Sequence, residues 1–103
     1  MEFKGTKGKW HSSYRNGSWL IQNEDDFNNN STNCIAESYY FNDGRDTAEA
    51  NVKLISKAPQ MLEMLQNQLE FLIYCRDNMK VSRPVFNQKV VRLEKLIKEA
   101  TEL

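Results

Sequence analysis

The sequence predicts an α+β fold, in which a small antiparallel β-sheet of about three strands is followed by three helices, the last two forming an antiparallel helical hairpin. Three observations support this prediction: an Asn-Gly pair between two segments of alternating polarity, a helical pattern interrupted by a proline, and two matched apolar seams in the second half. With 103 residues the chain is long enough for one modest core, so we expect a single domain over residues 1–103.

The first two strands form a predicted β-hairpin around Asn16-Gly17. This pair favours a type I′ turn, because asparagine and glycine both tolerate the positive φ angles that the turn requires. Pairing across the turn places Tyr14 opposite Trp19 and Ser12 opposite Ile21. The aromatic residues then share one face, and this alternation predicts a sheet with one buried side.

The remainder of the first half is interpreted from its composition. Residues 1–8 are short, basic and contain glycine, which indicates a flexible arm. The sheet is predicted over residues 9–41 and ends with a third strand over residues 34–41, where isoleucine, tyrosine and phenylalanine are frequent. Residues 23–33 are polar apart from Phe27, so we expect an exposed, mobile loop there.

Helix one is predicted over residues 46–58. Asp46 and Glu49 have the spacing of a capping box, in which the Asp46 carboxylate accepts a hydrogen bond from the Glu49 amide. Leu54 and Ile55 continue an apolar face, and we expect both to pack on the aromatic face of the sheet.

A helical hairpin is predicted over residues 59–103. Pro59 lacks an amide hydrogen and crowds the preceding turn, so helix one must end or kink near Lys57. The two helices after it carry apolar seams at alternating intervals of three and four residues. The seams consist of Leu62, Leu65, Leu69, Leu72 and Met79 on the first helix, and of Phe86, Val90, Leu93, Ile97 and Ala100 on the second. The pairs Glu94–Lys98, Lys95–Glu99 and Lys98–Glu102 indicate a solvated outer face.

The region around the proline resembles a group of small uncharacterised proteins encoded by phages and prophages. Those proteins begin with a Gly-Pro-Trp strand and later carry the motif A-N-x-x-L-I-x-x-A-P-x-L-L-x-x-L. The matching residues are Gly8 and Trp10, with Lys9 in place of the proline, and Ala50-Asn51, Leu54-Ile55, Ala58-Pro59, Leu62 and Leu65, with Met61 in place of a leucine. The resemblance implies a phage or prophage accessory protein, and it brings no established activity or catalytic residue.

Groups suited to catalysis are sparse, so we expect a non-enzymatic protein without cofactor or metal. His11 is the only histidine, and it is predicted on the strand face opposite the aromatic residues. Cys34 and Cys75 have no metal-binding spacing; two reduced thiols are favoured, with a disulfide left open. The acidic groups Glu24-Asp25-Asp26 and Asp43/Asp46 are expected to be solvated. No apolar run has the length of a membrane span, so a location in the cytoplasm of a bacterial host is expected.

The helical hairpin carries more apolar residues than its own seam needs. The surplus positions form a candidate interface made of Met61, Met64, Phe71, Ile73, Val91 and Leu96. A homodimer with a four-helix arrangement would bury them, and a tightly packed monomer is the alternative. We expect a protein that acts through contacts with itself or with an unidentified host or phage protein.

Basic residues gather around the turn between the last two helices. They form a candidate nucleic-acid contact made of Arg76, Lys80, Arg83, Lys89 and Arg92. Fourteen basic and fourteen acidic residues cancel over the whole chain, which favours ordinary surface charge at this turn. Nucleic-acid binding is therefore the alternative function, behind protein–protein contacts.

Overall fold

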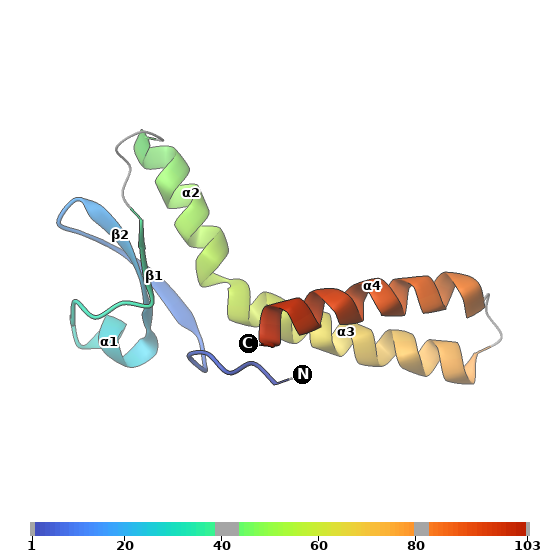
Figure 1. The fold of residues 1–103 in the computed structure, drawn as a ribbon. Coiled ribbons are helices and arrows are strands. Elements are labelled where there is room, and N and C mark those ends of the chain that lie inside the picture. The colour runs from blue at the N-terminus through green and yellow to red at the C-terminus, as the bar shows by residue number, and fades with distance from the viewer. Residues whose placement is uncertain (1, 39–43, 80–82, 103) are drawn as a thin grey trace. The chain divides into compact units, whose positions relative to one another are not determined.

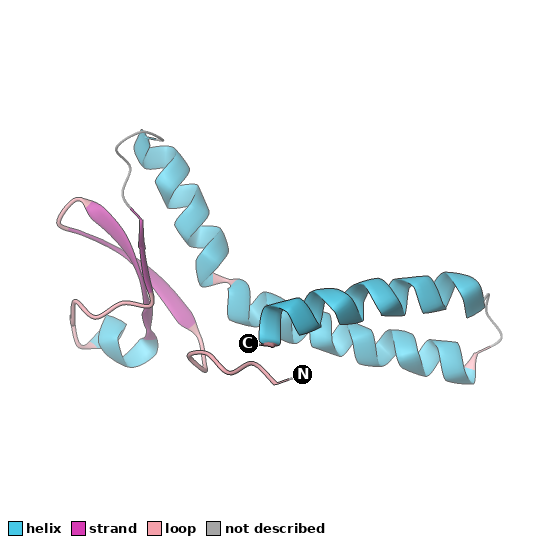
Figure 2. Cartoon of the chain, in the orientation of Figure 1, coloured by secondary structure: helices cyan, strands magenta, loops and turns pink. Residues whose placement is uncertain are grey.

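The computed structural model describes residues 2–38, 44–79 and 83–102 (Figure 1). Two compact units make up the chain: the sheet unit, Thr6–Gln60, and the hairpin unit, which joins Met61–Leu103 with Met1–Gly5. The order of elements is β1 (Trp10–Arg15), β2 (Ser18–Asn23), α1 (Glu24–Asn28), β3 (Ala36–Ser38), α2 (Gly44–Ser56), α3 (Ala58–Asn78) and α4 (Arg83–Thr101) (Figure 2). The predicted α+β class is confirmed, while a single domain over residues 1–103 stays a prediction.

The β-hairpin has the predicted turn and register. Asn16 and Gly17 have φ angles of 51° and 83°, and β1 pairs antiparallel with β2 so that Tyr14 lies opposite Trp19. The two rings are 5.4 Å apart between centroids and tilted by 56°. Local turn chemistry therefore sets the pairing of these strands, as expected when the backbone twist of the turn matches that of the strands.

The expectation of one buried sheet face is wrong at β2. This strand lies between β1 and β3, and its residues Leu20, Ile21 and Gln22 are all buried, although successive side chains point to opposite faces. Helix α2 packs against β1 and β2, and α1 also contacts both strands (Figure 1). Both faces of the central strand are thus covered.

The third strand is shorter than predicted. It comprises Ala36–Ser38 and pairs antiparallel with β2, Ala36 opposite Ile21 and Ser38 opposite Trp19. Residues 39–41 of the predicted strand lie outside the described residues. Within β3, the Glu37 Oε1 accepts a hydrogen bond of 2.7 Å from the buried Ser18 hydroxyl, which ties the short strand to its neighbour.

The predicted mobile loop is wrong, because residues 24–28 form α1. The Asn23 side chain caps this helix by accepting a hydrogen bond of 2.7 Å from the Asp26 amide, and acidic residues fill the first turn. An asparagine cap and negative charge at the N-terminus both stabilise a short helix. The Phe27 ring stacks on the His11 ring at 4.6 Å, which holds α1 on the sheet.

The segment after α1 is tied to the sheet by polar side chains. Gln22 is 0% exposed, and its Nε2 donates to the carbonyls of Ser31 at 2.7 Å and Asn33 at 2.9 Å. Its Oε1 accepts a hydrogen bond of 3.0 Å from the Ser13 hydroxyl. The Arg15 guanidinium donates to the carbonyl and the side-chain oxygen of Asn30. Hydrogen bonds from two strands therefore fix a segment that lacks apolar anchors.

Helix α2 uses a different face from the predicted one. Ala48, Val52 and Ser56 are buried at intervals of four residues, whereas Leu54 is 61% exposed and Ile55 is exposed as well. Compact side chains at successive turns allow the helix backbone to approach the sheet closely. The larger Leu54 and Ile55 are therefore excluded from the contact between helix and sheet. Asp46 lies inside the first turn of a helix that begins at Gly44, so it is not the predicted cap residue.

The predicted break at the proline is confirmed. Helix α2 ends at Ser56, the Lys57 amide donates to the Leu54 carbonyl at 3.1 Å, and α3 begins at Ala58 with Pro59 as its second residue. A proline in the first turn of a helix removes an amide that would have had no partner inside the helix.

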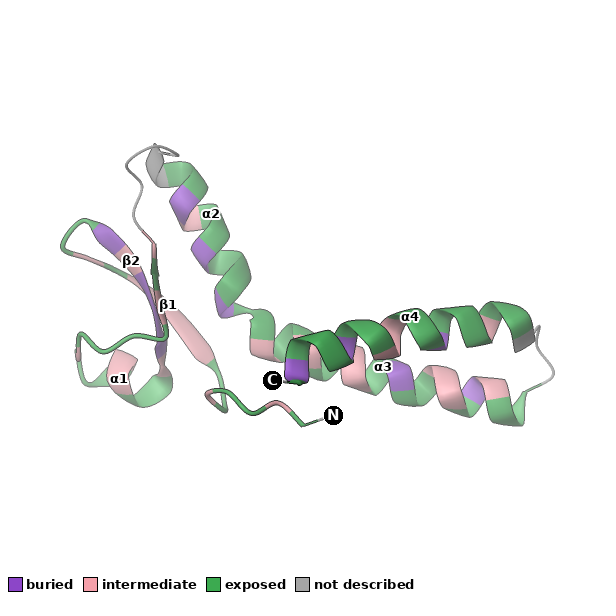
Figure 3. Ribbon diagram, viewed as in Figure 1, coloured by how far each residue is buried: buried purple, intermediate pink, exposed green. Residues whose placement is uncertain are grey.

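The hairpin unit is built on the predicted aliphatic seam. Leu69, Val90 and Ile97 form its buried cluster. Buried positions occur on both α3 and α4 (Figure 3). The residues packed against this cluster are Leu62, Leu65, Leu72, Ile73 and Leu93. The ends of the seam differ from the prediction, because Met79 and Ala100 are exposed while Cys75 and Thr101 are buried. Thr101 satisfies its hydroxyl by donating to the Ile97 carbonyl at 2.8 Å.

Candidate functional site

The exposed side of α3 carries a row of large apolar side chains, which we call the α3 face. It consists of Met61, Met64, Phe71 and Tyr74. Met64 is 69% exposed and Phe71 59% exposed, while the opposite side of the same helix packs on α4. The residues follow at intervals of three, seven and three, so they lie along one side of the helix.

The four side chains of the α3 face carry no charge, although Glu70 lies one turn from Tyr74 on the same helix. Asn67 and Gln68 fill the interval between Met64 and Phe71, and both are exposed. From Ala58 to Cys75 the charged residues of the helix are two glutamates, Glu63 and Glu70, seven residues apart. An uncharged apolar row on a solvent-facing helix is typical of an interface, because charged residues are depleted from interface cores.

The predicted interface residues of α3 divide into two groups. Met61, Met64 and Phe71 lie together on the α3 face. Ile73 is half-buried and packs against the Leu69 cluster, so the prediction that it is surplus to the seam is wrong. Position 73 follows Leu69 by four residues, which places it on the same side of the helix. Tyr74, 61% exposed, was missed by the sequence prediction, although it follows Phe71 by three residues.

The α4 part of the predicted interface is different in character. Val91 is exposed, but it lines a shallow hollow together with five charged residues: Glu94, Lys95, Lys98, Glu99 and Glu102. Ion pairs join Lys98 to Glu94 at 3.2 Å and Lys95 to Glu99 at 3.9 Å, as predicted. Leu96 is exposed and lies five residues from Val91, so the two do not share a helix face. The apolar surface is therefore concentrated on α3.

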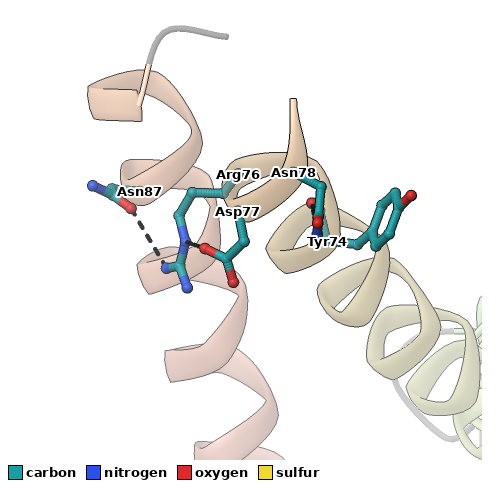
Figure 4. A network of polar contacts seen from close by, with 5 residues as sticks. All are labelled: Tyr74, Arg76, Asp77, Asn78 and Asn87. Atoms are coloured by element: carbon teal, nitrogen blue, oxygen red, sulfur yellow. Dashed lines mark hydrogen bonds and ion pairs between the residues drawn. The ribbon is translucent and has the colours of Figure 1, made fainter. Parts of the chain in front are cut away.

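The basic turn is only partly described. The Arg76 Nε lies 3.1 Å from the Asp77 carboxylate, and its Nη1 donates to the Asn87 side-chain oxygen at 3.5 Å (Figure 4). Lys80 and the side chain of Arg83 lie outside the described residues. Lys89 and Arg92 are exposed on α4, three residues apart. Contact between this turn and a nucleic acid stays a prediction.

His11, the one histidine of the sequence, belongs to the packing of α1. Its side chain is 18% exposed and its Nε2 lies 3.7 Å from the Glu24 Oε1, too far for a hydrogen bond. That buried nitrogen has no hydrogen-bond partner among the described residues. Cys34 is exposed, Cys75 is buried, and both are free thiols.

The described residues contain neither a cluster of metal ligands nor a helix suited to a membrane. In residues 2–38, 44–79 and 83–102, no group of three or more histidine, cysteine, aspartate or glutamate side chains is placed to hold a metal ion. Over the same part of the chain, no helix combines the length and the apolar character that crossing a membrane requires.

Comparison with known proteins identifies the family of the chain. No curated protein and no solved structure matches the chain. A family model described as Salmonella phage P22 protein Y8K6 matches residues 1–102, which includes both units. The expected phage origin is confirmed, whereas the tryptophan-strand and proline motifs are not tested by this match. The chain belongs to the Salmonella phage P22 protein Y8K6 family.

Proposed function

We propose that this phage protein is a non-enzymatic accessory protein that acts through protein–protein contacts, and that its α3 face joins two copies of the chain. The exposed, uncharged row formed by Met61, Met64, Phe71 and Tyr74 is the observation that carries this proposal. Burial of such side chains against a partner removes apolar surface from water, which is the main driving force of association.

A second copy suits this face better than a charged partner would. In a twofold dimer the same surface meets itself, so a row with charges of one sign would repel its copy. The centre of the α3 face limits this repulsion, because it holds methionine, phenylalanine, asparagine and glutamine, with Glu63 and Glu70 at its side. Met64 and Phe71 are seven residues apart, as are Met61 and Gln68, which is the repeat that two helices use when they pack side by side.

Sedimentation velocity over a concentration series tests the proposal. We expect the wild-type chain to be dimeric at about 100 µM and to dissociate on dilution, since an equilibrium between copies depends on concentration. Phe71→Glu places a charge at the centre of the α3 face, so we expect a monomer with an unchanged helical circular dichroism spectrum.

The matched control is Val91→Glu, which changes an equally exposed apolar residue on α4 among charged neighbours. We expect this variant to dimerise like the wild type. A monomeric wild-type chain at the highest concentration, or equal loss of dimer in both variants, would contradict the proposal.

A further inference from the structure

A second candidate site lies in the sheet unit. An open hollow of about 570 Å³ is lined by β1 and by the C-terminal turn of α2. Its walls include Lys9, Trp10 and Ser12 on the strand side and Lys53, Leu54 and Lys57 on the helix side. Binding sites for small molecules commonly enclose about 300–1,000 Å³, so the hollow has room for a ligand of that class.

The hollow is positively charged. Three lysines line it and no carboxylate does. Lys53 is partly neutralised, because its Nζ lies 3.0 Å from the Glu49 Oε1 one turn earlier on α2. Among residues 2–38, 44–79 and 83–102, no ion pair involves Lys9 or Lys57. Converging lysines attract anions, and phosphate is a common partner of lysine. Lys9 also borders a second hollow, which Glu24 and Asp25 line, so Lys57 has the fewest acidic neighbours of the three.

The hollow also has apolar walls. The Trp10 Nε1 donates to the Thr6 carbonyl at 3.0 Å, which fixes the orientation of the indole. Leu54 is 61% exposed and lines the same hollow from α2. The outward position of Leu54 leaves a large aliphatic side chain in solvent, and an apolar ligand surface beside it would remove that exposure.

We propose that this hollow binds a nucleotide, either free or as one unit of a single strand. Lys9, Lys53 and Lys57 hold its phosphate, and its base lies against Trp10 and Leu54. A nucleotide combines an anionic group, which suits the lysines, with a flat ring, which suits the apolar walls. Base stacking on aromatic side chains and lysine contacts to phosphate together are the usual means of binding single strands without sequence preference.

Chemical-shift mapping on the full-length ¹⁵N-labelled chain tests this site. The probes are dTMP, an oligothymidylate, inorganic phosphate and an oligoglutamate peptide, each added at low salt. We expect dTMP or the oligothymidylate to shift the Trp10 indole signal and the amides of residues 9–12 and 53–57. Shifts with dTMP identify a free nucleotide as sufficient, and shifts with the oligothymidylate alone identify the single strand as the source.

A pair of variants measures the role of the lysines. For the oligothymidylate, the slope of log K against log salt should fall in magnitude by about 0.7 in the double variant Lys9→Gln and Lys57→Gln, since the lysines hold one phosphate and each phosphate contact contributes about 0.7. The matched control is Lys95→Gln with Lys98→Gln on α4, which removes two exposed lysines elsewhere. This control should bind like the wild type.

Four outcomes would overturn the site. The first two are an absence of shifts with every probe, and binding of phosphate or of oligoglutamate that is as tight as binding of the nucleotide. The other two are shifts centred on Lys89 and Arg92, and an equal loss of oligothymidylate affinity in both double variants. The hollow and the α3 face belong to different units. The sedimentation result on dimerisation therefore does not decide whether the hollow binds a nucleotide.

Discussion

The sheet unit buries a polar side chain beside the aliphatic Ile21 and Val52, whereas the buried cluster of the hairpin unit is aliphatic alone. Gln22 and Ile97 are both 0% exposed. The glutamine makes three hydrogen bonds to Ser13, Ser31 and Asn33, while the isoleucine packs with leucine and valine across two helices. In the sheet unit, hydrogen bonds specify the position of the segment after α1, which lacks apolar anchors. In the hairpin unit, burial of aliphatic side chains holds α3 and α4 together.

The difference predicts different responses to substitution. Removing atoms from an aliphatic core leaves a cavity and loses transfer free energy, and the loss grows with cavity size. Removing one partner of a buried hydrogen bond leaves a carbonyl or hydroxyl without a partner. This lowers the free energy of unfolding by less than a cavity does, and it loosens the segment that the hydrogen bond held. Variants at the two centres therefore separate the two kinds of stabilisation.

The largest effect is expected from Ile97→Ala. Because Ile97 is fully buried in the hairpin cluster, the free energy of unfolding should fall by about 2–5 kcal/mol. Urea unfolding measures the change, and amide exchange should show lost protection in α3 and α4 with smaller changes in β1 and β2. The neighbouring control Leu96→Ala, at an exposed position, should change stability by less than about 0.5 kcal/mol. Equal effects of the two variants would show that the cluster is not the centre of this unit.

A smaller and more local effect is expected from Gln22→Leu. The leucine keeps the volume and removes the donors to Ser31 and Asn33, so the free energy of unfolding should fall by about 1–3 kcal/mol. Amides in residues 29–34 should exchange faster while α3 and α4 keep their protection. Gln88→Leu, at an exposed position of α4, is the control. Unchanged exchange in residues 29–34 would contradict the role of the buried glutamine.

The features predicted from the sequence are those set by near neighbours along the chain. The Asn16-Gly17 turn fixes the strand register, and Pro59 fixes the end of α2. The aliphatic seam follows from helical periodicity, which is why its centre at Leu69, Val90 and Ile97 was predicted. Its ends were not, because the last turns of a helical hairpin depend on where the helices stop facing each other.

The features that were missed depend on contacts between distant segments. Periodicity allows α2 to present either Leu54 or Val52 to the sheet, and the close approach of helix and sheet selects the smaller residue. Helix α1 is too short to show a period, although Asn23 before three acidic residues was a usable capping signal. On the α3 face the surplus of methionine and phenylalanine was predicted, and Ile73 was misplaced because its burial depends on α4.

The smallest effect, and the sharpest test of the polar side of the comparison, is expected from Asn23→Ala. The asparagine oxygen accepts from the Asp26 amide at 2.7 Å, and loss of such a cap costs about 0.5–2 kcal/mol. Helix α1 has five residues, so its formation depends on this cap and on the stacking of Phe27 on His11. We expect the Asp26 amide to exchange faster and the Phe27 ring signals to move toward their unfolded positions, while the hairpin unit is unchanged. Asn28→Ala, at the exposed last position of the same helix, keeps the cap and should preserve both signals. If the two alanine variants behave alike, the helix is held by the aromatic stack alone, and hydrogen bonding does not specify this segment of the sheet unit.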